Sequence, residues 1–173
     1  TSGSQELNIF LQHCISYPGP KGSVSQLGRC SIVSYEGDVV YDKFVKPSVP
    51  VTDYRTRWSG IRAKDLRKAT PYFQARKEIL KLLAGKIVIG HAVHNDFQVL
   101  QYSHPAALTR DTSRIPLLNR DFFKKQMTHH GDRSLRLQTG YGGHSSVEDA
   151  RATMELYKLV EDEWEKKLSL GKQ

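Results

Sequence analysis

The sequence has 173 residues, a length that suits one domain with a buried core. Its 38% hydrophobic and 25% charged residues are typical of a globular protein, and no apolar run is long enough to span a membrane. The net charge of +8 favours a polyanionic partner, while two cysteines, Cys14 and Cys30, exclude a disulfide framework and fit an intracellular protein. We expect a single domain over residues 5–168, with the first four residues left out.

The first part of the chain is rich in predicted strands. Residues 7–15 are mostly apolar and predict a central strand. Residues 26–35 and 39–46 carry β-branched and aromatic side chains, and the turn sequence at 36–38, Glu-Gly-Asp, joins them. These two segments therefore predict a hairpin, and the three together predict a meander of strands.

Two helices are predicted after the strands. Residues 64–68 favour a short helical segment. Thr70 is the predicted N-cap of a longer helix, because Pro71 suits the first helical position and apolar residues then follow at helical spacing. Gly85 is the predicted end of this helix.

The next elements return the chain to the sheet. Residues 86–91, KIVIGH, predict a short buried strand, and a helix is expected to open near Asn95 as its N-cap. Residues 109–113 predict one more short strand. A meander followed by alternating helices and strands indicates a three-layer α/β domain with a mixed sheet.

The last predicted helix begins within GGHSSVEDARATMELYKL, residues 142–159. Ser145 and Glu148 have the spacing of a capping box, so Ser145 is the predicted N-cap. An interaction with the helix dipole would suffice to explain an acid at such a start. The alternative is a functional carboxylate, because Asp149 is expected on a buried stripe, where an unpaired charge is costly. The other members of this inward face are Ala152, Thr153, Leu156 and Val160.

A second acid, Asp96, lies in GHAVHNDFQVL directly after a predicted strand. Ligands collect at strand ends in α/β sheets, and both Asp96 and Asp149 are placed at helix starts. Carboxylate oxygens suit Mg²⁺ or Mn²⁺, and two such ions can activate water against a phosphodiester. His144, five residues before Asp149, is placed to take the proton of that water.

GHAVHNDFQVL and GHSSVEDARATMELYKLVE resemble motifs of the DEDDh 3′–5′ exonucleases. Within that superfamily the chain is similar to the interferon-stimulated exonuclease and apoptosis-enhancing nuclease family, and most to the paralogue linked to ribosomal RNA maturation. GPKGSVSQLGRCSIVSYEGDVVYDKFVKP, VTDYRTRWSGI, LKLLAGKIVIGHAVHNDF and LTRDTSRIP extend the resemblance over most of residues 19–165.

The resemblance implies an RNase H-like exonuclease fold, two divalent metal ions, and release of nucleotides from 3′ ends of RNA or single-stranded DNA. It also implies a nuclear, nucleolar location. We further expect a monomer with no membrane partner. Asp96 and Asp149 match the family's metal ligands, and His144 matches its general base.

The first family motif is altered. Alignment through residues 19–22 places Gln12 where the family has aspartate and Cys14 where it has glutamate. The two positions share one strand face, yet neither supplies a carboxylate, and Mg²⁺ does not favour sulfur. We expect at most one weakly held divalent ion and impaired turnover. The alternative is a pseudo-exonuclease that binds nucleic acid or a protein partner without cleavage.

A second departure lies at residues 134–143, where about two turns of a family helix are missing. Both departures are abrupt, which fits alternative exon use or an altered sequence as well as evolutionary decay. Arg55 in DYRTRWSG is the candidate contact to phosphate or ribose, against the alternative of a solvated loop. A zinc cluster of His129 and His130 with His13 and Cys14 matches no known zinc spacing.

Overall fold

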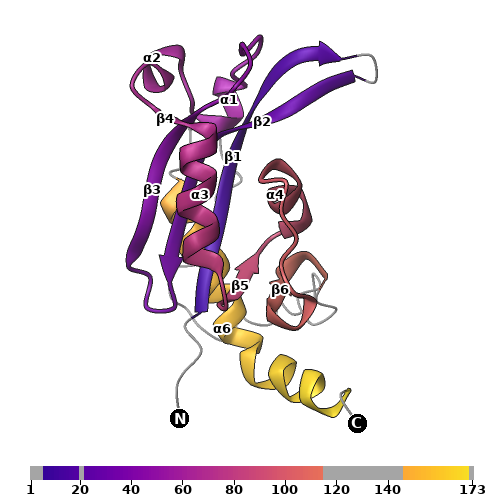
Figure 1. Cartoon of the computed structure of the whole chain (residues 1–173). Coiled ribbons are helices and arrows are strands. Elements are labelled where there is room, and N and C mark those ends of the chain that lie inside the picture. Colours follow the sequence, from indigo (N-terminus) through magenta and orange to yellow (C-terminus); the bar gives the residue numbers. More distant parts are fainter. Residues whose placement is uncertain (1–5, 20–21, 115–145, 172–173) are drawn as a thin grey trace.

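The computed structural model describes residues 6–19, 22–114 and 146–171 (Figure 1). Its centre is a six-stranded sheet in the order β4-β3-β2-β1-β5-β6. β1 pairs antiparallel with β2, and β2 with β3, whereas the β1–β5, β5–β6 and β3–β4 pairs are parallel. The predicted mixed sheet is therefore confirmed. The strands are β1 (Glu6–Gly19), β2 (Gly22–Ser34), β3 (Val39–Lys46), β4 (Thr70–Pro71), β5 (Ile87–Gly90) and β6 (Thr109–Asp111).

The predicted meander is confirmed, and its strands are bent by a bulge beside the first motif. Gln12 of β1 pairs with Arg29, but the next residue of β1 pairs with Leu27, so Gly28 is an extra residue on β2. The bulge shifts the alternation of side chains along β2. As a result Leu27 and Cys30, three residues apart, belong to the same hydrophobic cluster.

Helices cover both faces of the sheet, which gives the three predicted layers (Figure 1). α3 (Tyr72–Leu83) and α4 (Val93–Val99) lie on one face, and α6 (Ser146–Leu170) lies on the other. Short helical segments complete the described chain. These are α1 (Thr56–Ser59), α2 (Ala63–Leu66), η1 (Ala106–Leu108) and η2 (Thr112–Arg114).

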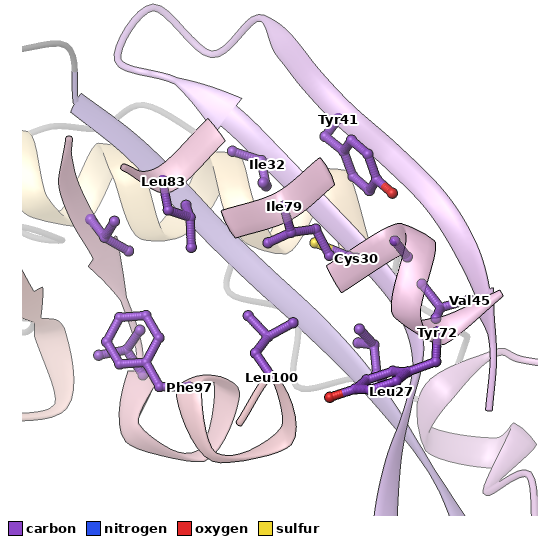
Figure 2. Packing of buried hydrophobic residues seen from close by; sticks show 13 residues of the cluster. Leu27, Cys30, Ile32, Tyr41, Val45, Tyr72, Ile79, Leu83, Phe97 and Leu100 are labelled. Atoms are coloured by element: carbon purple, nitrogen blue, oxygen red, sulfur yellow. The ribbon is translucent and has the colours of Figure 1, made fainter. Parts of the chain in front are cut away.

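The larger core lies between the sheet and the α3–α4 layer (Figure 2). Cys30 and Ile32 of β2 lie there with Ile79 of α3 and Leu100, the C-cap of α4, and all four are fully buried. The opposite face packs on α6 through small clusters that include Val33, Val147 and Ala150, and Ile89, Met154 and Tyr157. Because strand side chains alternate between faces, Cys30 and Val33 of one strand serve different layers.

Two predicted helix starts are wrong. Thr70 does not cap α3, because its backbone is extended and pairs with Val45 of β3, and Pro71 takes the N-cap position. α4 begins at Val93 rather than near Asn95, with Ala92 as its N-cap. The predicted cap Ser145 lies outside the described residues. Within the described residues, no helix combines the length and apolarity that a membrane crossing requires.

Candidate functional site

Asp96 is a buried carboxylate in the first turn of α4, 8% exposed. Burial raises its pKa well above the ordinary value, and the nearby charge of Asp111 raises it further. Asp96 also contributes, after burial itself, to the raised pKa of the Cys30 thiol. Cys30 pairs with Leu11 on β1, and α4, the helix of Asp96, contacts β1. That Asp96 and the first-motif positions form one site stays a prediction.

Asp149 lies in the first turn of α6 and is half-buried. The buried residues of α6 include Thr153, Leu156 and Val160, as the predicted inward face required, with Asp149 at the margin of this face. The start of α6 is held to the sheet by a buried contact between the Ser146 and Ser31 hydroxyls. This contact positions the turn that carries Asp149.

The Ser31 contact is part of a larger polar network on β2 and β3. The Ser31 hydroxyl donates to Asp42 Oδ1 at 2.8 Å, and Arg29 donates two hydrogen bonds of 2.9 Å to the Asp42 carboxylate. Burial alone would raise the pKa of Asp42, but the bonds from Arg29 and Ser31 outweigh it and lower the pKa. Asp42 is therefore ionised at neutral pH and orders the side chains that hold α6.

The two acids lie on helices that pack on opposite faces of the sheet. α4 and α6 both contact β1, the strand of Gln12 and Cys14. Among the described residues, no group of three or more His, Cys, Asp or Glu side chains is placed to hold a metal ion. The predicted base His144 and the proposed zinc residues His129 and His130 lie outside the described residues.

Arg55 lies in a tight turn before α1, as predicted for a loop contact. Its backbone has φ 48° and its amide donates to Asp53 Oδ1 at 2.8 Å. A left-handed conformation is uncommon for a side chain of this size, so the Asp53 bond is part of what holds the turn. The Arg55 side chain is exposed, and α1 contacts β1. An exposed cation therefore lies near the central strand.

A cavity of about 790 Å³ opens between α4, β6 and the end of α6. Its lining combines aromatic rings, which include Phe97, Tyr102 and Trp164, with the cations Arg114 and Lys167. Asp111 also lines it. Rings and cations side by side are the side chains that bind bases and phosphates of single strands.

A family model described as "Exonuclease" matches residues 11–157 of this chain. The chain belongs to the exonuclease family. The match spans β1 to α6 and therefore includes the altered first-motif positions as well as Asp96 and Asp149.

Curated relatives carry nuclease names. The chain is 58% identical over 161 residues to interferon-stimulated 20 kDa exonuclease-like 2 of Bos taurus, covering 87% of this chain and 45% of that protein. It is 54% identical over 154 residues to apoptosis-enhancing nuclease of Homo sapiens, covering 85% of this chain and 47% of that protein. The chain thus spans about half the length of these relatives.

Solved structures confirm the RNase H-like exonuclease fold. The exonuclease-containing module of apo Pan2 from Saccharomyces cerevisiae has a TM-score of 0.71 and 23% identity, with 97% of this chain and 31% of that chain covered. The same module in complex with AAUUAA RNA has a TM-score of 0.69 and 22% identity, with 93% and 29% covered. At these identities the likeness establishes the fold alone.

The sequence prediction missed Asp111 and the Ser31–Asp42 network. Asp111 was included in a short strand, but Asp-Thr-Ser at 111–113 is also a typical sequence for side-chain-to-backbone hydrogen bonds at a turn. That signal marks a local bond to Ser113. It does not reveal that the same carboxylate also binds residue 92. Ser31 and Asp42 carry no comparable signal, because their pairing depends on strand register.

Proposed function

We propose that this chain is an exonuclease-family domain that binds 3′ ends of RNA or single-stranded DNA and hydrolyses them slowly, in the 3′–5′ direction. The observation that carries the proposal is the buried Asp96 carboxylate, whose pKa the charge of Asp111 raises and whose helix contacts β1. Two acids in a buried place favour a cation, because the cation relieves both desolvation and mutual repulsion. Membership of the exonuclease family supports a role for that cation in phosphodiester hydrolysis.

The donor set fits one divalent ion better than two. Asp96 and Asp149 offer carboxylate oxygens to Mg²⁺ or Mn²⁺, whereas Gln12 offers a neutral oxygen and Cys14 a sulfur that these ions disfavour. A bound divalent ion supplies Lewis acidity toward water and the phosphodiester. His144 then serves as the proton acceptor. Removal of two anions from a two-ion site is the reason we expect weak metal binding and slow turnover.

Single-stranded nucleic acid is the partner that the surface supports. The net charge is +8, Arg55 is exposed near β1, and rings and cations line the cavity beside Asp111. Relatives are named as exonucleases and nucleases, and Pan2 modules were solved with RNA. A nuclear and nucleolar location, by family resemblance, and a monomeric state complete the proposal.

A pseudo-exonuclease is the second candidate, favoured by Gln12 and Cys14. It would bind single strands, or a protein partner, through the same surfaces without cleavage. The experiment that separates the two is turnover of a 3′-labelled single-stranded RNA with Mn²⁺. It compares the unmodified chain with Gln12→Asp/Cys14→Glu, and uses Asp96→Asn in each background as the control for contaminating nuclease.

The proposed function predicts slow turnover in the unmodified chain, a gain on the order of a thousandfold after the double reversion, and loss with Asp96→Asn. A thousandfold corresponds to about 4 kcal/mol at the barrier, a reasonable size for restored metal ligands. No Asp96-dependent turnover in the unmodified chain, with retained RNA binding, would establish the pseudo-exonuclease. No gain after reversion would show that the shortened segment 134–143 also prevents catalysis.

A further inference from the structure

The connection between β5 and α4 contains a strained residue, Ala92. Its backbone has φ 55° and ψ 42°, a left-handed conformation that residues with a side chain rarely adopt. Ala92 is the N-cap of α4, yet its own side chain offers no capping oxygen. Since Asp96 follows four residues later in the first turn, the geometry of this residue determines where the Asp96 carboxylate points.

Asp111 holds this strained residue from across the chain. Its Oδ1 accepts the Ala92 amide at 2.9 Å, the Ser113 amide at 3.0 Å and the Ser113 hydroxyl at 2.7 Å. Burial would raise the pKa of Asp111, but these bonds outweigh burial and lower the pKa. Asp111 therefore remains an anion although it is only 6% exposed.

Hydrogen bonds from the residue after Asp111 hold the end of β5 as well. Thr112 Oγ1 donates to the Gly90 carbonyl at 3.3 Å and lies 3.1 Å from Nδ1 of His91. Asp111 itself pairs with Gly90 in the β5–β6 ladder. Consecutive residues of β6 and η2 thus bind consecutive residues of the β5–α4 turn. These hydrogen bonds hold the turn as a unit, and among them only those of the Asp111 carboxylate involve a charged group.

The second carboxylate oxygen of Asp111 is available for an electrostatic role. Within the described part of the chain, Oδ2 is buried and has no hydrogen-bond partner, and the Arg114 guanidinium approaches it only to 3.8 Å from a largely exposed position. An anion that is hydrogen-bonded on one oxygen, and is approached on the other only by this exposed cation, adds negative potential to its surroundings. Asp96 is within reach of that potential.

We propose that Asp111 is the positioning residue of the Asp96 site. Its carboxylate fixes Ala92 in the left-handed conformation that aims Asp96, and its charge strengthens cation binding there. The inference rests on the proposed function only in taking Asp96 as a metal ligand. The two contributions are separable, because Asp111→Asn keeps an oxygen for the Ala92 amide and removes the charge, whereas Asp111→Ala removes both.

The test uses the full chain in the Gln12→Asp/Cys14→Glu background and, in parallel, without reversion. Two readouts are taken: hydrogen exchange of the Ala92 amide, and Mn²⁺ affinity from the electron paramagnetic resonance signal of free Mn²⁺. Asp111→Ala is expected to speed Ala92 exchange at least tenfold and to weaken Mn²⁺ binding about tenfold. Asp111→Asn is expected to weaken Mn²⁺ binding with a smaller change in exchange.

A rescue variant separates positioning from general damage. Ala92→Gly removes the cost of the left-handed backbone, so Asp111→Ala/Ala92→Gly should regain part of the lost Mn²⁺ affinity. Asp65→Ala is the matched control, because Asp65 also accepts a backbone amide at a helix start, that of Arg62 at 2.8 Å. It removes the same charge on α2 and should leave both readouts unchanged.

The proposal fails if Asp111→Ala leaves Ala92 exchange and Mn²⁺ affinity as they were, or if Ala92→Gly restores nothing. Equal losses with Asp65→Ala would also overturn it, because they would show a general effect of net charge. If no variant in either background binds Mn²⁺, the proposed metal function fails instead. The exchange of the Ala92 amide then still decides whether Asp111 holds the turn.

Discussion

Ser31→Ala should destabilise the protein and loosen the start of α6. Ser31 is fully buried, and its hydroxyl donates to the ionised Asp42 at 2.8 Å while it contacts the Ser146 hydroxyl. A hydrogen bond to a charged group contributes about 1.5–3 kcal/mol, and a buried hydroxyl left without its partner costs about 1–3 kcal/mol. Arg29 keeps its bonds to Asp42, so we expect a loss of unfolding free energy toward the lower end of the combined range, about 3 kcal/mol.

The assay is urea denaturation, with thermal unfolding beside it. For a domain of this size about 3 kcal/mol corresponds to a fall in Tm of about 6–12 °C. Ser146→Ala alone should cost less, and the double variant should cost about 1 kcal/mol less than the sum of the single ones, because no orphan hydroxyl remains. The exposed Ser48→Ala is the control, within about 0.5 kcal/mol of the unmodified chain.

The stability loss caused by Ser31→Ala should depend on pH in one direction. The pKa of Asp42 is lowered in the folded state, so its bonds contribute fully above the unfolded value near 4 and are lost as pH falls through the folded value. The loss of unfolding free energy caused by Ser31→Ala should therefore be smaller at acid pH than at pH 7. A cost below about 0.5 kcal/mol at pH 7, or strictly additive single variants, would refute the reasoning.

Three further predictions follow from the same structure. Asp96→Asn should stabilise the metal-free protein at pH 7 but not below pH 4. The reason is that the raised pKa of Asp96 makes its ionised form unfavourable in the folded state as pH rises. Urea titrations that show no such pH dependence would contradict this. Glu165→Ala should cost about 3 kcal/mol in unfolding free energy, since it removes the carboxylate paired with the buried Arg110 guanidinium, whereas the exposed Glu163→Ala should cost under about 0.5 kcal/mol. Arg55→Ala should weaken binding of single-stranded RNA severalfold at low salt, and affinity that does not change with salt would exclude an electrostatic contact.

The sequence by itself determined the elements whose signals are local. Alternating and continuous apolar residues predicted the central strand and its hairpin, and Gly37, at φ 87°, occupies the turn expected at 36–38. Helical spacing predicted the inward faces of α3 and α6, and Gly85, at φ 70°, follows α3 as a typical terminating residue. These features depend on residues a few positions apart, so the order of residues suffices to find them.

The tertiary structure decided the features that depend on distant residues. Thr70 is a typical cap, yet pairing with β3 extends its backbone. Asn95 is also a typical cap, but α4 starts earlier because Asp111, nineteen residues away from Ala92, holds that residue in a left-handed turn. The same holds for Asp96, whose pKa is raised by burial and then by the charge of Asp111 on β6, fifteen residues further along the chain. A carboxylate can be found in a sequence, but its environment forms only when the strands pair and the helices pack, because desolvation and like-charge repulsion come from residues that the chain brings together in folding.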